Sequence, residues 1–217
     1  RAMGAHVRGD GTGTIVIEGS DELHPADHPI IPDRIEAGTF MVAAAITGGH
    51  VVMKNLSPDS LQGDVRFPAL LGEMGCRITR HENKIELHGN TLRGIEVDMN
   101  EIPDSVPALA VVAAFADGPT SIFGVAHLRH KETDRLGALA AELTRLGANV
   151  ELRDDGFTIH PRPLRGATIE TYNDHRIAMS FAVAGLRVKG VVITNPACVG
   201  KSFPAFWEAF SKLEEQE

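Results

Sequence analysis

An alanine-rich apolar segment followed by a short, mostly β-branched run occurs three times along the chain. The apolar segments cover residues 35–46, 106–116 and 175–186, and the runs that follow them cover 50–53, 120–123 and 191–194. Val52, Ile122 and Val192 occupy equivalent places and recur at a constant spacing of 70 residues. A fixed period of this kind indicates a repeated structural unit, here a helix followed by a strand.

The three apolar segments carry almost no charge on any face. A helix that is apolar all round is buried all round, so the pattern predicts a domain with parallel buried helices inside and sheets outside. A conventional layered α/β fold is the alternative that the pattern leaves open.

Further elements follow in each unit. An amphipathic pattern predicts a helix over 132–146 that ends at Gly147, and Asp155-Gly156 is a hairpin signal. The other elements predicted in these parts are helices within 61–74 and 204–213 and strands at 76–79, 84–87, 149–152 and 157–159. The chain therefore reads as an α/β (α+β) fold of three βαβαββ repeats, the last incomplete, over approximately 32–90, 91–161 and 162–217.

Composition narrows the class of protein. The 217 residues carry a formal net charge of −8, which argues against nucleic acid as the main partner. The longest apolar run falls far short of the roughly 18 residues that a membrane span needs, so we expect no membrane contact and a cytoplasmic location. Cys76 and Cys198 form neither a disulfide framework nor a CxxC site. Because the chain begins at Arg1 without a methionine, we expect a piece of a longer protein.

Basic side chains stand where several of the predicted helices begin. They are Arg129, Lys131, Arg135, His175, Arg176 and Lys201. A cation at a helix N-terminus opposes the helix dipole unless an anion lies between them, so the pattern predicts a phosphate or carboxylate site. Parallel buried helices would bring these N-termini to one face. Solvated surface charges, an i,i+3 pair of Arg135 with Glu132, or a core position for His175 are the alternatives.

Two carboxylates, Asp104 and Glu132, lie among these cations, and such a pair beside a bound phosphate suits proton transfer. The alternative is helix capping, which is also open to Asp174 and Ser202. The spacing of His24 and His28 does not favour zinc, and the glycines of residues 9–13 lack the GK[ST] ending of a phosphate-binding loop.

Five segments together resemble the C-terminal half of the EPSP synthase family. They are residues 61–67 (LQGDVRF), 99–104 (MNEIPD), 130–136 (HKETDRL), 172–179 (YNDHRIAM) and 198–204 (CVGKSFP). The resemblance implies an enzyme that joins phosphoenolpyruvate to the 5-hydroxyl of shikimate 3-phosphate through a tetrahedral intermediate, with release of phosphate. It implies no metal and no organic cofactor.

The resemblance also implies two domains of this fold that close on the substrates. Residues 32–217 would be one of them, residues 1–31 the connecting strand and linker, and a complementary N-terminal domain would lie outside this chain. By the family's pattern, phosphoenolpyruvate is bound by Lys131, Arg135, Arg176 and Lys201, with His175 beside them.

Further roles follow from the same pattern. Asp104 would hold the shikimate hydroxyl and take its proton, and Glu132, together with Lys131, would serve catalysis, Glu132 by helping to protonate the methylene carbon. His127 stands where the family often has an asparagine that touches the shikimate ring, which puts that contact in doubt.

The segments 14–19 and 31–40 instead resemble the sister family, UDP-N-acetylglucosamine 1-carboxyvinyltransferase, which shares fold and donor but takes a sugar-nucleotide acceptor. A domain of that enzyme is therefore an alternative, and a non-catalytic anion-binding module is another. Asp104 and Glu132 argue against the module, because anion binding needs no carboxylates.

Overall fold

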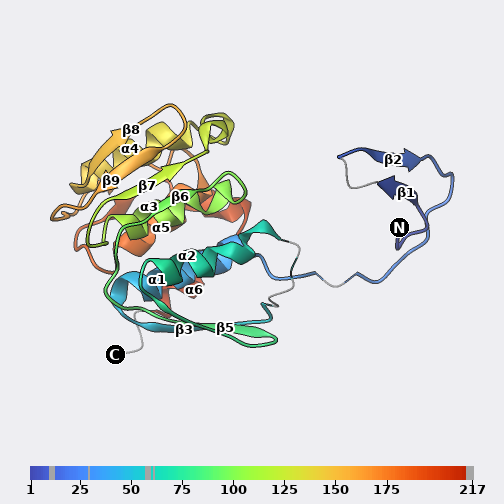
Figure 1. The fold of residues 1–217 in the computed structure, drawn as a ribbon, viewed down its shortest axis with the longest axis horizontal. Helices are drawn as coiled ribbons and strands as arrows, with labels where there is room; N and C mark the ends of the chain where they lie inside the picture. The colour runs from blue at the N-terminus through green and yellow to red at the C-terminus, as the bar shows by residue number, and fades with distance from the viewer. Residues whose placement is uncertain (10–12, 29, 57–59, 61, 214–217) are drawn as a thin grey trace. The chain divides into compact units, whose positions relative to one another are not determined.

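The computed structural model describes residues 1–9, 13–28, 30–56, 60 and 62–213. The chain divides into two compact units, Arg1–Ile31 and Pro32–Glu217 (Figure 1). In the first unit, β1 (His6–Gly9) and β2 (Ile15–Glu18) form an antiparallel hairpin. The division falls at the boundary that the sequence analysis places between residues 31 and 32, and the role of the first unit as an inter-domain connector stays a prediction.

Three helices form the centre of the second unit. They are α1 (Arg34–Thr47), α3 (Val106–Ala113) and α5 (His175–Ala184), and they pack against one another (Figure 1). Every residue of α3 is buried, as are nearly all residues of α1 and α5. The prediction of buried apolar helices is confirmed. Small side chains such as Ala43 and Ala110 allow this close approach of the backbones.

Three sheets surround this centre. One is antiparallel with the order β3-β5-β4, and a second has the order β6-β7-β9-β8 with β6 and β7 parallel; β10 and β11 form a parallel pair. Their bounds are β3 (His50–Lys54), β4 (Arg77–Arg80), β5 (Lys84–His88), β6 (Glu96–Asp98), β7 (Thr120–Phe123), β8 (Asn149–Leu152), β9 (Phe157–His160), β10 (Thr168–Ile169) and β11 (Val192–Ile193). In β5, Ile85 and Leu87 are buried, whereas the alternating Lys84, Glu86 and His88 are half-buried, so one face packs inward.

The remaining helices are shorter or amphipathic. They are α2 (Phe67–Glu73), α4 (Arg135–Leu146) and α6 (Phe206–Ser211), with 3-10 turns η1 (Gly63–Arg66), η2 (Pro103–Ser105), η3 (Ala126–His130) and η4 (Pro196–Lys201). Residues 96–160 follow the order β6-α3-β7-α4-β8-β9, which is βαβαββ. The division of the whole chain into three repeats stays a prediction.

Several predicted boundaries are wrong. The helix predicted from residue 132 begins at Arg135, because the Asp134 side chain accepts a hydrogen bond from the Gly137 N–H and caps the helix there. The helices predicted over 106–116, 175–186 and 204–213 are shorter at one or both ends. The helix predicted within 61–74 begins at Phe67 after η1, and Leu61 lies outside the described residues.

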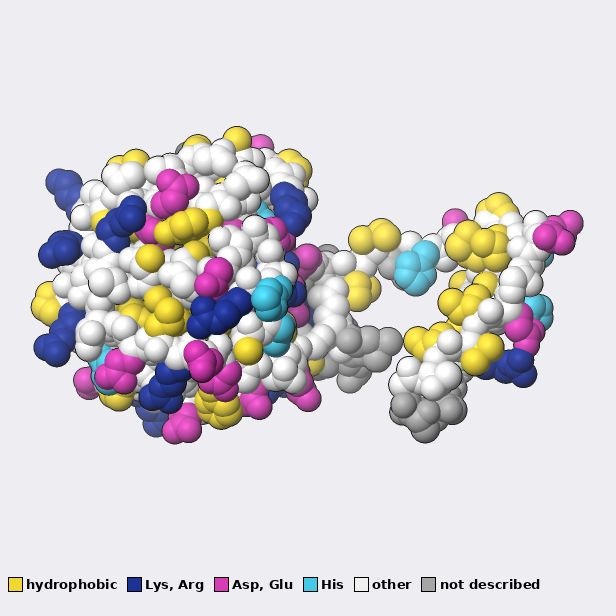
Figure 2. Space-filling view, turned by 90° about the horizontal axis from the view of Figure 1, so that it is seen from above, with side chains coloured by type: hydrophobic (Ala, Val, Ile, Leu, Met, Phe, Trp, Pro, Cys, Tyr) yellow, Lys and Arg dark blue, Asp and Glu magenta, His cyan; other side chains and the backbone are white. Residues whose placement is uncertain are grey.

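The longest helix of the described chain, α1, has 14 residues, and none there has the length and hydropathy of a membrane span. On the face of the second unit seen in Figure 2, basic and acidic side chains lie interspersed rather than in a patch of one sign.

Candidate functional site

The N-terminal ends of the three buried helices meet. Asp104, in η2 just before α3, lies with its Oδ2 3.7 Å from Nη2 of Arg176 in the first turn of α5. Glu36, in the first turn of α1, accepts a hydrogen bond of 2.7 Å from Ser202, and the charge of Arg176 acts on it. The predicted parallel arrangement of these helices therefore brings their positive dipole ends to one place.

Four basic side chains lie at this place, and we call them the cationic cluster: Lys131, Arg135, Arg176 and Lys201. Lys131 Nζ lies 3.3 Å from Asp104 Oδ1, and Arg135 Nη1 donates to the same oxygen at 2.8 Å. Glu132 joins the other side, because it accepts from Arg135 Nη2 at 2.6 Å and from Lys201. Side chains from separate segments of the chain thus form one continuous network of ion pairs, as the sequence analysis expects.

Arg135 is the buried centre of this network, with only 1% of its side chain exposed. Its Nε donates to Asp174 Oδ2 at 2.7 Å and its Nη2 to Asp174 Oδ1 at 3.3 Å, which is a two-pronged contact with a fully buried carboxylate. Burial alone lowers the pKa of Arg135, but the hydrogen bond and charge of Asp174, with the charges of Glu132 and Asp104, raise it above its usual range. The i,i+3 pair with Glu132 is one contact among several.

Exposure differs strongly across the cationic cluster. The side chain of Lys201 is 57% exposed and that of Lys131 33%, whereas Arg176 is 13% exposed. Nη1 of Arg176 is buried and has no hydrogen-bond partner among the described residues. A buried guanidinium nitrogen without a partner is a donor available to a ligand. The two lysines are the part of the cluster that solvent reaches most readily.

Both carboxylates of the site are ionised at neutral pH. Burial raises the pKa of Asp104, but the charges of Arg176, Arg135 and Lys131 outweigh it and lower that pKa below its usual range. For Glu132, partial burial is likewise outweighed by the Lys201 hydrogen bond and by Arg135, and its pKa falls to about 2. Cations on several sides therefore keep the acids charged.

The capping alternatives divide. Asp174 is the N-cap of α5, since its carboxylate accepts from the Arg176 N–H at 2.9 Å. Asp104 does not cap α3. The N-cap residue of that helix is Ser105, whose side chain makes no capping hydrogen bond. Ser202 follows η4 and donates to Glu36 rather than capping α6. The carboxylate of Asp104 is therefore available for its ion pairs with the cationic cluster.

His175 begins α5 and is only 3% exposed. Its Nδ1 lies 3.8 Å from Asp174 Oδ1 and has no hydrogen-bond partner among the described residues. Burial, followed by the charge of Arg176, lowers its pKa, so the ring is neutral at pH 7. It is therefore a buried histidine with an unused ring nitrogen beside the cluster, not one whose polar atoms are all satisfied in the core.

Two predicted residues lie apart from the network. His127, in η3, is exposed, and no ion pair or hydrogen bond of the described residues joins it to the cationic cluster. Arg129 donates to the carbonyl oxygens of Arg153 and Asp154 and to the carboxylate of Asp134. Its guanidinium therefore binds the β8–β9 hairpin and the N-cap of α4, not the cationic cluster. The prediction that Arg129 belongs to the anion site is wrong.

Sequence reasoning missed Glu36 and saw Asp174 and Ser202 only as helix caps. Glu36 Oε2 is buried without a partner among the described residues, and burial raises the pKa of this acid despite the Ser202 hydrogen bond. The available signal was the position of a carboxylate in the first turn of a helix whose charged residues, Arg34 and Glu36, both lie at its start. The described residues also contain one group of possible metal ligands, His50, Glu86 and His88, on the β3-β5-β4 sheet rather than at the cationic cluster.

Comparison with known proteins gives a consistent result. The family model for EPSP synthase (3-phosphoshikimate 1-carboxyvinyltransferase) matches residues 1–210. The 3-phosphoshikimate 1-carboxyvinyltransferase of Methanosphaerula palustris is 48% identical over 186 residues, which are 85% of this chain and 44% of that protein. The enzyme of the same name from Methanoculleus marisnigri is 44% identical over 208 residues, or 95% of this chain and 49% of that protein.

Solved structures agree. The EPSP synthase structure from Acinetobacter baumannii determined at 2.37 Å matches with a TM-score of 0.82 and 33% identity, over 97% of this chain and 52% of that one. The chain spans about half the length of the curated relatives it matches. Because the family model covers nearly all of the sequence and the fold agrees, this chain belongs to the EPSP synthase family.

Proposed function

We propose that this chain is the phosphoenolpyruvate-side domain of a 3-phosphoshikimate 1-carboxyvinyltransferase. With a complementary N-terminal domain, it transfers the enolpyruvyl group to the 5-hydroxyl of shikimate 3-phosphate and releases phosphate, without a metal or organic cofactor. One observation carries the proposal: Lys131, Arg135, Arg176 and Lys201 meet around shared carboxylates at the N-terminal ends of buried helices. This is a site for a small, multiply charged anion.

The donor binds by exchange of partners. Phosphoenolpyruvate carries a phosphate and a carboxylate, and both can accept hydrogen bonds from the exposed amino groups of Lys131 and Lys201. Nη1 of Arg176 supplies a further donor, which has no hydrogen-bond partner in the described part of the chain. Arg135 can contact the donor only if Asp104 or Glu132 releases it, because its bonds are directed to carboxylates. His175, neutral and with a free Nδ1, lies beside these groups.

The two carboxylates have different tasks. Asp104, kept ionised by its neighbours, can accept the proton of the shikimate hydroxyl as the oxygen attacks C2 of the donor. Glu132 must give a proton to the methylene carbon, which a pKa of about 2 forbids in the free domain. When Lys201 turns to the phosphate, the hydrogen bond that lowers this pKa is lost, so donor binding raises the pKa and lets Glu132 take up from solvent the proton that it then gives to the carbon. The remaining cations stabilise charge on the intermediate.

The alternatives concern the acceptor and the chemistry. A sugar-nucleotide acceptor was predicted from residues 14–19 and 31–40, and the cationic cluster does not distinguish acceptors. A non-catalytic module would bind the anion without needing Asp104 and Glu132. One set of assays distinguishes both alternatives, the sugar-nucleotide acceptor and the non-catalytic module, from the main proposal.

The chain is combined with the N-terminal half of the Methanosphaerula palustris relative, and phosphate release is measured with shikimate 3-phosphate or UDP-N-acetylglucosamine. We expect phosphate release from phosphoenolpyruvate when shikimate 3-phosphate is the acceptor and none when UDP-N-acetylglucosamine is the acceptor. The isolated chain should show no turnover with either acceptor. Asp104→Ala and Glu132→Ala should abolish it, and Lys201→Ala should weaken phosphoenolpyruvate binding about 10-fold or more. Lys189→Ala, an exposed lysine outside the cluster, is the matched control. Turnover by the isolated chain, or full rates in both carboxylate variants, would refute the proposal.

A further inference from the structure

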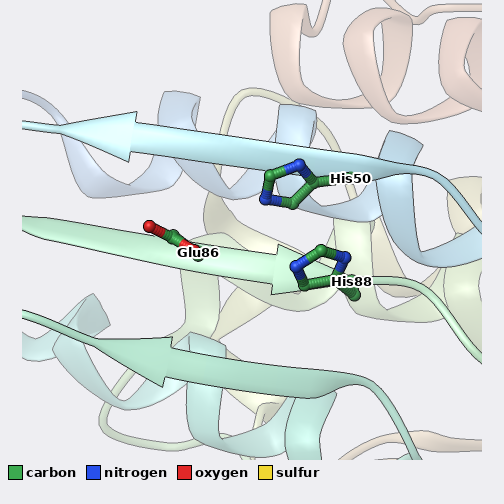
Figure 3. Close-up of side chains that lie close together, drawn as sticks. All are labelled: His50, Glu86 and His88. Atoms are coloured by element: carbon green, nitrogen blue, oxygen red, sulfur yellow. The ribbon is translucent and has the colours of Figure 1, made fainter.

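The exposed face of the β3-β5-β4 sheet brings together two histidines and a glutamate (Figure 3). His50 of β3 pairs directly with His88 of β5 in the antiparallel register, and Glu86 precedes His88 by two residues on the same face. One ligand atom from each of the three residues lies within 4.8 Å of the others. The sheet register, not a local sequence motif, creates this group.

Solvent has access to the group. His50 is exposed, and Glu86 and His88 are half-buried. A shallow hollow beside the two histidines is lined by them, by Arg77 and Asn90, and by Gly48, Gly49 and Gly89; Glu86 is not one of its lining residues. A Cβ placed on Gly48 would meet nothing within 4 Å, so the space beside the turn is open. An ion and its water ligand therefore have room to enter.

The two imidazole rings are stacked, with centroids 3.9 Å apart and planes 6° from parallel. Parallel stacked rings point their lone pairs side by side, so one ring must turn about its Cβ–Cγ bond before both can bind one ion. The exposed ring of His50 is free to do so.

We propose that His50, Glu86 and His88 bind a Zn²⁺ ion, with water in the fourth position. Two imidazole nitrogens and a carboxylate oxygen are a donor set that zinc accepts in tetrahedral geometry. Zinc bonds of about 2.0–2.2 Å place ligand atoms roughly 3.3 Å apart, so the present separations close by side-chain rotation, without movement of the strands.

The surroundings set the conditions for binding. Lys84 Nζ lies 2.5 Å and His81 Nε2 3.2 Å from Glu86 Oε1, so both must release this carboxylate to the ion. Arg77, paired with His88 across β4 and β5, adds repulsion. The C-terminal carbonyls of α1 lie close to Gly89 and favour a cation there. Protons compete with a metal for imidazole nitrogens, so zinc should bind more tightly at pH 7.5 than at pH 6.0.

The site is separate from the cationic cluster. His50 follows the C-terminus of α1, whereas the cluster lies at its N-terminus, and a helix of 14 residues is roughly 21 Å long. The zinc proposal thus stands or falls independently of the proposed function.

Isothermal titration of Zn²⁺ into the chain at pH 7.5 and 6.0, in a non-chelating buffer, tests the proposal. We expect a one-to-one binding event at pH 7.5 that weakens about 10-fold or more in His50→Gln and in His88→Gln, and also in Glu86→Gln. His160→Gln is the matched control, because His160 lies 3.0 Å from Glu151 on the β8–β9 pair but is not part of the group. Co²⁺ should give the visible absorption of a tetrahedral site in the wild type and in His160→Gln, but not in the three ligand variants.

Three results would overturn the proposal. The first is zinc binding that persists unchanged in both histidine variants, and the second is an equal loss in His160→Gln. The third is the absence of zinc binding together with binding of inorganic phosphate that is lost in both histidine variants, since Arg77 and two protonated histidines would hold an anion. The three ligands are not in the buried core, so thermal unfolding of the variants should match the wild type and exclude a folding defect.

Discussion

Replacement of Arg135 by methionine tests whether the buried network holds the domain together. The variant keeps much of the side-chain volume but removes the guanidinium. The Asp174 carboxylate, which is 0% exposed, then loses its two-pronged contact with a cation. Removing one member of a buried ion pair costs about 3–5 kcal/mol, because an uncompensated charge is left behind. Asp104 and Glu132 also lose a partner, but their solvent exposure limits that contribution.

The expected loss is a large share of the roughly 5–15 kcal/mol that stabilises a typical domain. At about 2–4 °C per kcal/mol for a chain of this size, the Tm should fall by roughly 6–20 °C. Urea unfolding and calorimetry measure both quantities. Arg145→Met is the comparison on the same helix: Arg145 is 48% exposed, and its buried partner Glu142 keeps hydrogen bonds from the Glu170 N–H and the Tyr172 hydroxyl, so its loss should cost less than that of Arg135.

A double variant adds a second check. In Arg135→Met/Asp174→Asn, the buried charge is removed and the amide oxygen can still cap α5, so we expect it to be more stable than the single variant. The reasoning fails if Arg135→Met costs no more than Arg145→Met. It also fails if Asp174→Asn adds its full separate cost, because two coupled residues must show non-additive losses.

Three further predictions concern other parts of the molecule. The lowered pKa of Glu132 stabilises the fold above about pH 4.5 and this stabilisation is lost as the pH falls towards about 2, so Glu132→Gln should flatten acid unfolding curves in that interval. Gly94→Ala should cost at least about 2 kcal/mol, because its Cβ would lie 1.9 Å from a backbone carbonyl oxygen, whereas Gly200→Ala meets nothing within 4 Å and should cost nothing. Burial raises the pKa of both Cys76 and Cys198, so alkylation of the folded chain at pH 7 should be slower than that of the urea-unfolded chain; equal rates would contradict this.

The buried helices were predictable because complete burial leaves a mark in the sequence itself. The segment that became α3 contains no charged residue, so no orientation could place it at a surface. The strands β6 and β10 have three and two residues, too few to show alternation, and were missed. The start of α4 was placed three residues early, because Glu132 and Thr133 fit a helix as well as a loop and only the Asp134 cap decides between them.

That the basic side chains of the candidate site lie together was predictable only from their positions at the starts of predicted helices. Lys131 and Lys201 are 70 residues apart, yet each stands before a predicted helix, and the packing of α1, α3 and α5 brings their surroundings together. The same rule placed Arg129 in the site, where the structure instead turns it to the β8–β9 hairpin. The contact of His50 with His88 had no sequence signal, because strand register alone sets it.

The state of Glu132 decides how the candidate site works. In the free domain every cation of the cluster already has a carboxylate within 4 Å, so an anion that binds the lysines must replace one of these partners. The exposed pair of Lys201 and Glu132 exchanges more easily than Arg135 and Asp174, which solvent does not reach. Carboxyl-carbon NMR should therefore show the pKa of Glu132 rising from about 2 when inorganic phosphate is added, and no such rise in Lys201→Ala. An unchanged Glu132 titration with phosphate bound would mean that the anion leaves the Lys201 pair intact, and the proposed link between donor binding and proton donation would be wrong.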